Sequence, residues 1–162
     1  IDLRNNGGGL VKEALSIADY IVPKGKTLLI TVDKNENEDI EKAKEDPIID
    51  MPIVVLVNKN TASASEILAG ALKDKYPNTT IVGMKTYGKG VIQTLYSLTD
   101  GSGLKITTEE YYTPNHNKIN KEGITPDVEV DLTKDADGKY ETSFDKDAQV
   151  KKAIETVKSK IK

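Results

Sequence analysis

The sequence contains no cysteine and no tryptophan, and it has only one histidine and one phenylalanine. The lack of cysteine excludes disulfides, thiol catalysis and zinc sites with cysteine ligands, but it does not identify a redox compartment. Arg4 is the sole arginine, so bidentate clamps for phosphate or carboxylate groups are nearly unavailable. No apolar run approaches the roughly 18 to 20 residues of a membrane-spanning helix.

The charge is nearly balanced. The 162-residue chain carries 23 basic and 26 acidic residues, which gives a net charge of −3. Because the two signs are interspersed and no basic stripe stands out, nucleic acid is not expected as the main partner. Hydrophobic residues make up 37% and charged residues 30%, which is typical of a globular chain with a core and a polar surface.

The chain opens on IDLRNNGGG, without a methionine or a signal peptide. Residues 1–3 look like the end of a strand whose start is missing. We therefore expect a fragment of a longer protein, in which absent targeting signals carry no meaning.

Apolar periodicity predicts alternating strands and helices. Helices are expected over 9–22, 65–76 and 148–162, and strands over 27–33, 52–58, 79–84, 91–98 and 103–114. The β-branched run 52–58 predicts a strand buried on both faces, and the last two strands a hairpin. The charged stretch 33–46 is expected to be a solvated loop or surface helix. This order favours an α/β fold with partly parallel pairing and one continuous core that includes strand 91–98.

The stretch GMKTYGKG (residues 83–90) is close to a phosphate-binding P-loop. Such a loop needs Ser or Thr after the lysine and a following helix, whereas Gly90 and a strand-like run follow Lys89. Both requirements fail. A lysine between glycines can instead act as a general base, if burial in an apolar pocket lowers its pKa from ~10.4 toward ~7 to 8. The alternative is a surface lysine in a tight turn.

Two serines lie where a buried strand passes through a small-residue loop into a helix. Helix N-terminal amides beside Ser63 or Ser65 could stabilise an oxyanion. The alternative is that Ser63, three residues before Glu66, only caps the helix in a capping box. His116, the single histidine, lies in the polar loop TPNHNK, which argues against a Ser-His-Asp triad. A Ser/Lys pair needs no histidine.

Five stretches in order resemble the carboxyl-terminal processing proteases, also called tail-specific proteases. They are DLRNNGGGL, VNKNTASASEILAGALKD, GMKTYGKGVIQ, GSGLKITTEEYYTP and GITPDVEV. The resemblance implies a protease core similar to the ClpP/crotonase group, with a mixed sheet and flanking helices, over residues 1–131. Residues 132–147 are then expected to be a connector before the C-terminal helix 148–162.

The resemblance also implies roles for particular residues. Ser63 is the expected nucleophile, Lys89 the general base, and Gln93 the residue that orients the lysine. The expected oxyanion hole uses the backbone N–H of Ala64 and that of Gly9, with Gly8 as the alternative. These roles need no metal or cofactor. Regular strand geometry would hold Lys89 and Gln93 ~13 Å apart, so their contact requires Lys89 to sit on a turn that folds back.

The implied function is a serine endopeptidase that cleaves proteins near exposed carboxyl-terminal tails. The family's substrate-binding PDZ domain would lie upstream of Ile1, and the resemblance implies an exported, extracytoplasmic parent protein that can carry a membrane anchor. Two alternatives are a non-catalytic peptide-binding remnant of the same fold and a nucleotide-binding domain. His116 stands where the family usually has glycine, in a turn away from the Ser/Lys pair.

Overall fold

The computed structural model describes residues 1–134, 137 and 143–161. Within these residues the chain forms α1 (Val11–Asp19), β1 (Thr27–Asp33), β2 (Glu38–Lys42), β3 (Ile53–Val57), α2 (Ala64–Lys75), β4 (Thr79–Gly83), β5 (Val91–Ser97), β6 (Gly103–Tyr112), β7 (Val128–Glu129) and α3 (Ala148–Lys160). The three predicted helices are present. Part of the predicted connector, residues 135–136 and 138–142, lies outside the described residues.

A parallel sheet with the order β3-β4-β7 forms the centre of the fold. The opening segment adds to its edge, because Asp2 pairs in parallel with Leu56, and the N–H of Leu3 donates to the Leu56 carbonyl oxygen at 2.9 Å. The end of β3 and the opening glycines therefore reach the same side of the molecule.

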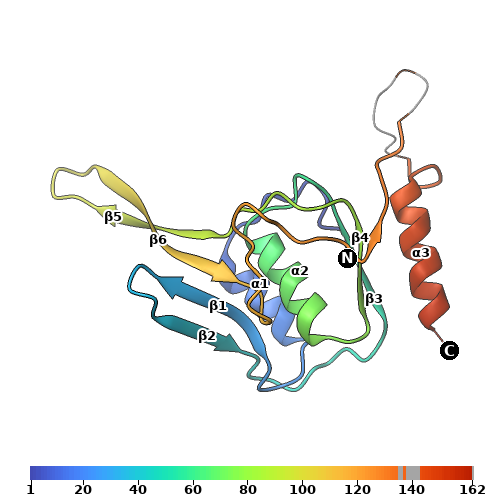
Figure 1. Cartoon of the computed structure of the whole chain (residues 1–162), viewed down its shortest axis with the longest axis horizontal. Helices are drawn as coiled ribbons and strands as arrows, with labels where there is room; N and C mark the ends of the chain where they lie inside the picture. Colours follow the sequence, from blue (N-terminus) through green and yellow to red (C-terminus); the bar gives the residue numbers. More distant parts are fainter. Residues whose placement is uncertain (135–136, 138–142, 162) are drawn as a thin grey trace.

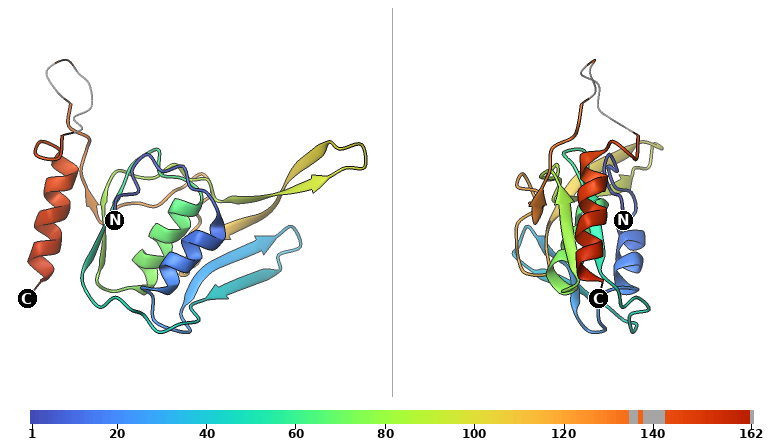
Figure 2. Two further views of the ribbon diagram at one scale, coloured as in Figure 1. Left: turned by 180° about the vertical axis from the view of Figure 1, so that it is seen from behind. Right: turned by 90° about the vertical axis from the view of Figure 1, so that its right-hand side faces the viewer.

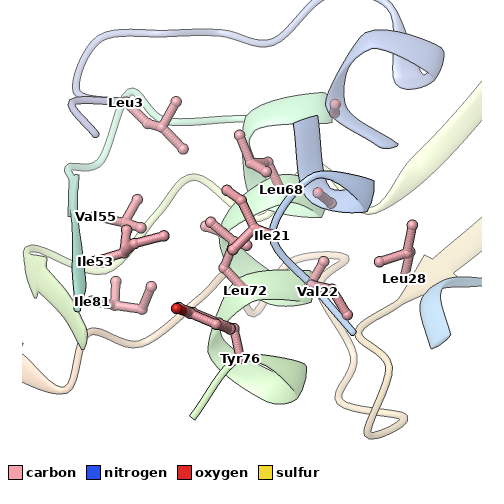
Figure 3. Packing of buried hydrophobic residues seen from close by; sticks show 14 of the residues in the cluster. Leu3, Ile21, Val22, Leu28, Ile53, Val55, Leu68, Leu72, Tyr76 and Ile81 are labelled. Carbon is pink, nitrogen blue, oxygen red and sulfur yellow. The ribbon is translucent and has the colours of Figure 1, made fainter. Parts of the chain in front are cut away.

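Both faces of this sheet are covered, as the run of β-branched residues predicts. All five residues of β3 are buried. Ile53, Val55 and Val57 belong to the apolar cluster formed with α1 and α2, which Figure 3 shows around Leu72 and Tyr76. The alternate residues of β3 pack instead with Val150 of α3. Figure 2 shows α3 on the outer side of the sheet and the α1–α2 pair on the inner side. Period-two alternation thus divides one strand between two cores.

A second, antiparallel sheet has the order β2-β1-β6-β5. The expectation of a loop or surface helix over 33–46 is wrong for Glu38–Lys42, which forms β2 at the edge of this sheet. Pairing with β1 supplies the hydrogen bonds, while the charged side chains face solvent, as is common on edge strands. A single apolar residue, Ile40, gives too little alternation to predict a strand from sequence.

The hairpin of β5 and β6 is confirmed, but its place in a continuous core is not. The hairpin projects away from the body (Figure 1), and Leu95, Tyr96 and Leu104 are exposed on it. Among the residues that the structure describes, the buried apolar side chains form three clusters, and β5 contributes only the partly buried Ile92 to one of them. Only the base of the hairpin lies near the candidate site, because β5 begins two residues after Lys89.

Candidate active site

Ser63 lies at the turn that joins β3 to α2, and it directly precedes Ala64, the first residue of the helix. Its backbone has φ +57° and ψ −124°, a region that residues with a side chain rarely occupy. Such a conformation costs on the order of 1–3 kcal/mol and persists only where the surroundings enforce it. The candidate nucleophile is therefore held in a strained backbone at the end of the central sheet.

The buried carboxylate of Glu66 enforces this turn and connects it to the lysine loop. Its Oε2 accepts the backbone N–H groups of Ser63 and Lys89, each at 2.9 Å. Its Oε1 accepts Thr86 Oγ1 at 2.5 Å and the Gly88 N–H at 2.7 Å. The backbones of Ser63 and Lys89 thus meet at one oxygen atom, although the residues are 26 positions apart.

Glu66 bears on the capping alternative as well. Its side chain binds the Ser63 N–H, which is the Glu66 half of a capping box. Its own N–H donates to the main-chain carbonyl oxygen of Ser63 at 2.8 Å, so that N–H is satisfied by backbone. Helix capping and a catalytic role for the Ser63 hydroxyl are therefore compatible.

The opening glycine loop lies against the Ser63 turn. Gly8 has φ +87°, and a Cβ there would come within 2.7 Å of both the Ala64 nitrogen and the Ala62 oxygen, so only glycine fits. The Gly8 N–H donates to Asn6 Oδ1 at 2.9 Å. Among the hydrogen bonds of the described residues, none uses the N–H of Gly9 or Ala64. Of the two glycine alternatives, the free N–H favours Gly9.

Arg4 anchors the start of this loop. Its guanidinium binds the carboxylate of Asp2 at 2.7 Å and that of Asp147, at the start of α3, at 2.5 Å. Burial alone would raise the pKa of Asp2, but the hydrogen bonds and charge of Arg4 outweigh it and hold that pKa below its usual value. The same two carboxylates raise the pKa of Arg4. The loop before the glycines is thereby tied to the C-terminal helix.

A cavity of about 210 Å³ opens beside the free N–H groups. Gly8, Gly9 and Ala64 line it on one side. Most of the remaining wall is apolar and comes from Leu3, Leu10, Ala14, Ile17 and Leu68. Such a cavity offers an apolar place next to two backbone donors.

The side-chain amine of Lys89 does not lie with Ser63 and the two free N–H groups in this structure. Its backbone is fixed by Glu66, but the Lys89 side chain is exposed, and the expected burial in an apolar pocket is wrong for this structure. Gln93 is also exposed, on β5, where its Nε2 lies 3.5 Å from Thr107 Oγ1 rather than at the lysine. The described residues bring Ser63, Ala64 and Gly9 together with the Lys89 main chain, whereas Gln93 stays apart.

The glycines around Lys89 have structural reasons. Gly88 has φ +86°, and a Cβ on Gly90 would lie 2.2 Å from the backbone nitrogen of Asn120. Lys89 lies in the irregular segment between β4 and β5, and the expected turn that folds back to Gln93 is not observed. The next element is the strand β5, so the loop does not lead into a helix N-terminus as a P-loop must.

Two other sequence candidates lie away from the strained turn. Ser65 is 5% exposed and lines the cavity wall within α2. His116 is exposed, with φ +61°, and its Nδ1 lies 3.8 Å from a carboxylate oxygen of Glu38. Neither replaces Ser63 or Lys89 in the site.

Sequence reasoning missed two residues here. Glu66 was considered only as a helix cap, and Tyr111 was not considered. Tyr111 is 1% exposed, and its hydroxyl donates to the carbonyl oxygen of Lys89. Tyr111 lies in the stretch EEYYTP, whose pattern predicts a strand and does not distinguish this tyrosine from its neighbours.

In the part of the chain that the structure describes, no helix has the length and apolar character needed to cross a membrane. Over the same residues, no cluster of three or more His, Cys, Asp or Glu side chains is arranged to hold a metal ion.

Comparison with known proteins identifies the family. The model of peptidase family S41 matches residues 1–130. The carboxyl-terminal-processing protease of Synechocystis is 44% identical over 153 residues, covering 90% of this chain and 35% of that protein. The chloroplastic C-terminal processing peptidase of Tetradesmus obliquus is 48% identical over 132 residues, covering 81% of this chain and 28% of that protein.

A solved structure shows the same fold. The photosystem II D1 C-terminal processing protease superposes with a TM-score of 0.75 at 45% identity, covering 85% of this chain and 36% of that chain. This chain spans about a third of the length of such relatives. The match over residues 1–130 and these identities agree with the strained serine turn and the lysine loop described above, and the chain belongs to peptidase family S41.

Proposed function

We propose that this chain carries the catalytic centre of a serine endopeptidase that cleaves proteins near their carboxyl termini. Ser63 is the nucleophile, Lys89 the general base and Gln93 the residue that orients the lysine. The observation that carries the proposal is the strained Ser63 backbone, φ +57°, beside the free N–H groups of Ala64 and Gly9. Strain of this kind is concentrated at functional sites.

The chemistry follows from these groups. Neutral Lys89 Nζ accepts the proton of Ser63 Oγ as the oxygen attacks the scissile carbonyl carbon. The negative charge that develops on the carbonyl oxygen is stabilised by the N–H of Ala64 and that of Gly9. The protonated lysine then donates to the leaving amine, and water hydrolyses the acyl ester on Ser63 by the same steps in reverse order.

The lysine side chain has to turn inward before this reaction can occur. Its main chain is already held at the Glu66 carboxylate that binds the Ser63 N–H. Rotation about the four-carbon stem is then the main change required, without a rearrangement of the loop. Gln93 would have to leave Thr107 and follow the amine.

The substrate is expected to be a protein or peptide with an accessible carboxyl-terminal tail. The names of the relatives support this class, since they describe C-terminal processing. The apolar cavity next to Gly9 and Ala64 supports an apolar side chain at the residue that precedes the scissile bond. The extracytoplasmic location stays a prediction, which fractionation of cells that produce the protein would test.

Substitution of the two serines tests the nucleophile. In the protein at its full natural length, Ser63→Ala should abolish cleavage of an unfolded protein substrate. Ser65→Ala, two residues further along the chain, should leave a measurable rate because Ser65 lies within α2 in the wall of the cavity and not at the strained turn. Equal loss from both changes would contradict the assignment of Ser63.

A peptide assay separates a protease from a peptide-binding remnant. Binding and cleavage are measured on one apolar-tailed peptide with a free carboxylate and on its amidated form. A protease acting near carboxyl termini should cleave the free form faster. Binding of both peptides without cleavage by the full-length protein would favour the remnant.

A further inference from the structure

Two asparagines join the loops that carry the proposed oxyanion donors. Gly9 belongs to the opening glycine loop and Ala64 to the Ser63 turn, so both N–H groups can bind one oxygen only if the two loops keep a fixed relative position. Asn58 directly follows β3 and is 1% exposed. Asn5 lies at the start of the opening loop. The two side chains meet between the loops, where Asn58 Nδ2 donates to Asn5 Oδ1 at 3.0 Å.

The backbone determines which way these two amides point. Asn58 Oδ1 accepts the backbone N–H groups of Asn5 and Asn60, each at 3.0 Å. Because two donors face this oxygen, the Nδ2 group of Asn58 is left to face Asn5. Asn5 must then present its own oxygen, which accepts Asn58 Nδ2 and also Asn60 Nδ2, the latter at 2.9 Å. The pairing is reciprocal, since each asparagine binds the other through one donor and one acceptor.

Further hydrogen bonds continue this connection along both loops. The Thr61 hydroxyl accepts the Asn58 N–H at 3.0 Å and donates to the Leu3 carbonyl oxygen at 2.8 Å. The Ala62 N–H donates to the Asn6 carbonyl oxygen at 3.0 Å. The opening loop is thus bound at several successive points to the segment between β3 and α2.

The Asn5 backbone allows the side chain to be changed without changing the loop. Its φ is +59°, in the left-handed region that glycine, asparagine and aspartate adopt more readily than other residues. Asn5→Asp keeps an acceptor for both NH₂ groups that Asn5 Oδ1 binds. Asn5→Gly removes that acceptor and takes from the buried Asn58 Nδ2 its partner in this pair.

We propose that Asn5 and Asn58 are positioning residues for the reaction, because their amide pair sets the relative position of the two backbone donors that bind the developing oxyanion. This inference rests on the proposed peptidase function. The residues that line the cavity where substrate is expected to bind include neither asparagine. The oxyanion forms only along the reaction path, so a displaced donor lowers kcat and leaves the binding of uncleaved substrate unchanged.

The test compares two substitutions of Asn5 in the full-length protein. Asn5→Gly should lower kcat about 10- to 100-fold with KM unchanged, because small displacements of a catalytic group have effects of that size. Asn5→Asp should stay within about threefold of the wild-type kcat, because a carboxylate accepts the same two NH₂ groups. Glu36→Gly is the matched control and should keep the wild-type rate, since Glu36 also has a positive φ, +63°, but is exposed between β1 and β2.

A peptide aldehyde separates positioning from a general weakening of the fold. Ser63 Oγ adds to the aldehyde carbon, the hydroxyl proton passes to Lys89, and the aldehyde oxygen becomes the bound oxyanion. Asn5→Gly should weaken aldehyde binding by the same factor as it lowers kcat/KM, and should leave binding of the corresponding peptide alcohol unchanged. A merely structural role would lower Tm and the active fraction without this parallel loss of affinity.

Amide hydrogen exchange gives a reading that does not depend on activity. If the asparagine pair holds the two loops together, the Ala62 N–H, which donates to the Asn6 carbonyl oxygen, should exchange faster in Asn5→Gly and not in Asn5→Asp. Equal kcat values for these two variants, an equal loss in Glu36→Gly, or an unchanged Ala62 exchange rate would overturn the positioning role. If the wild-type protein cleaves no peptide and binds no aldehyde, the proposed function itself fails, and the positioning role fails with it even where the exchange rates differ.

Discussion

The Glu66 carboxylate is the point at which the structure is most sensitive to a small chemical change. It is fully buried, and its two oxygens accept four hydrogen bonds, two from Ser63 and Lys89 and two from Thr86 and Gly88. Glu66→Gln keeps the shape of the side chain but replaces one acceptor oxygen with an NH₂ group. If the NH₂ group takes the place of Oε2, the N–H groups of Ser63 and Lys89 both face a donor. If it takes the place of Oε1, the Gly88 N–H faces a donor, while the Thr86 hydroxyl can turn to accept.

The magnitude follows from the number of bonds lost. Each hydrogen bond to a charged group contributes about 1.5–3 kcal/mol, so loss of one or two predicts destabilisation by about 1.5–6 kcal/mol. That is a large part of the total of about 5–15 kcal/mol for a typical domain. We expect Glu66→Gln to unfold at much lower urea concentration than the wild-type chain, or to be unfolded without urea.

Urea unfolding followed by circular dichroism measures this change. Glu155→Gln is the matched control, because Glu155 is exposed on α3 and, among the described residues, its ion pair is with Lys152, at 2.9 Å. An exposed substitution of this kind should change the unfolding free energy by less than about 0.5 kcal/mol. A loss below about 1 kcal/mol for Glu66→Gln would refute the reasoning that this carboxylate connects the two loops.

Three further predictions concern the residues around the site. Gly90→Ala should destabilise the protein by about 1–3 kcal/mol or more, because the new methyl group would lie 2.2 Å from the Asn120 nitrogen, and a fall in Tm checks this. Asp147→Ala should cost about 2 kcal/mol or more in urea unfolding, since it removes the cap of α3 and takes from Arg4 its buried carboxylate partner. Lys89→Arg should abolish cleavage with little change in Tm, because an exposed guanidinium fits the loop but stays protonated at any working pH; retained cleavage would exclude Lys89 as the base.

Local patterns determined much of the fold. The run of β-branched residues in β3 and the apolar faces of α1, α2 and α3 are properties of neighbouring residues, and each produced the predicted element. Two strands were not predicted, β2 and the two-residue β7, and the charged residues of β2 form a strand only because β1 offers a partner. Hydrogen bonding to another segment is not visible in local composition.

The site divides in the same way. The sequence by itself indicated the serine turn, the lysine between glycines and the opening glycine loop, because glycines and small residues at a strand end permit the tight backbone conformations that such loops need. Only the tertiary structure decided that Glu66 joins the Ser63 and Lys89 backbones, that Tyr111 binds the Lys89 carbonyl oxygen and that the lysine amine is exposed. The contacts of Lys89 with Glu66 and with Tyr111 join residues 23 and 22 positions apart. They depend on how sheets and helices pack, which no short stretch of sequence encodes.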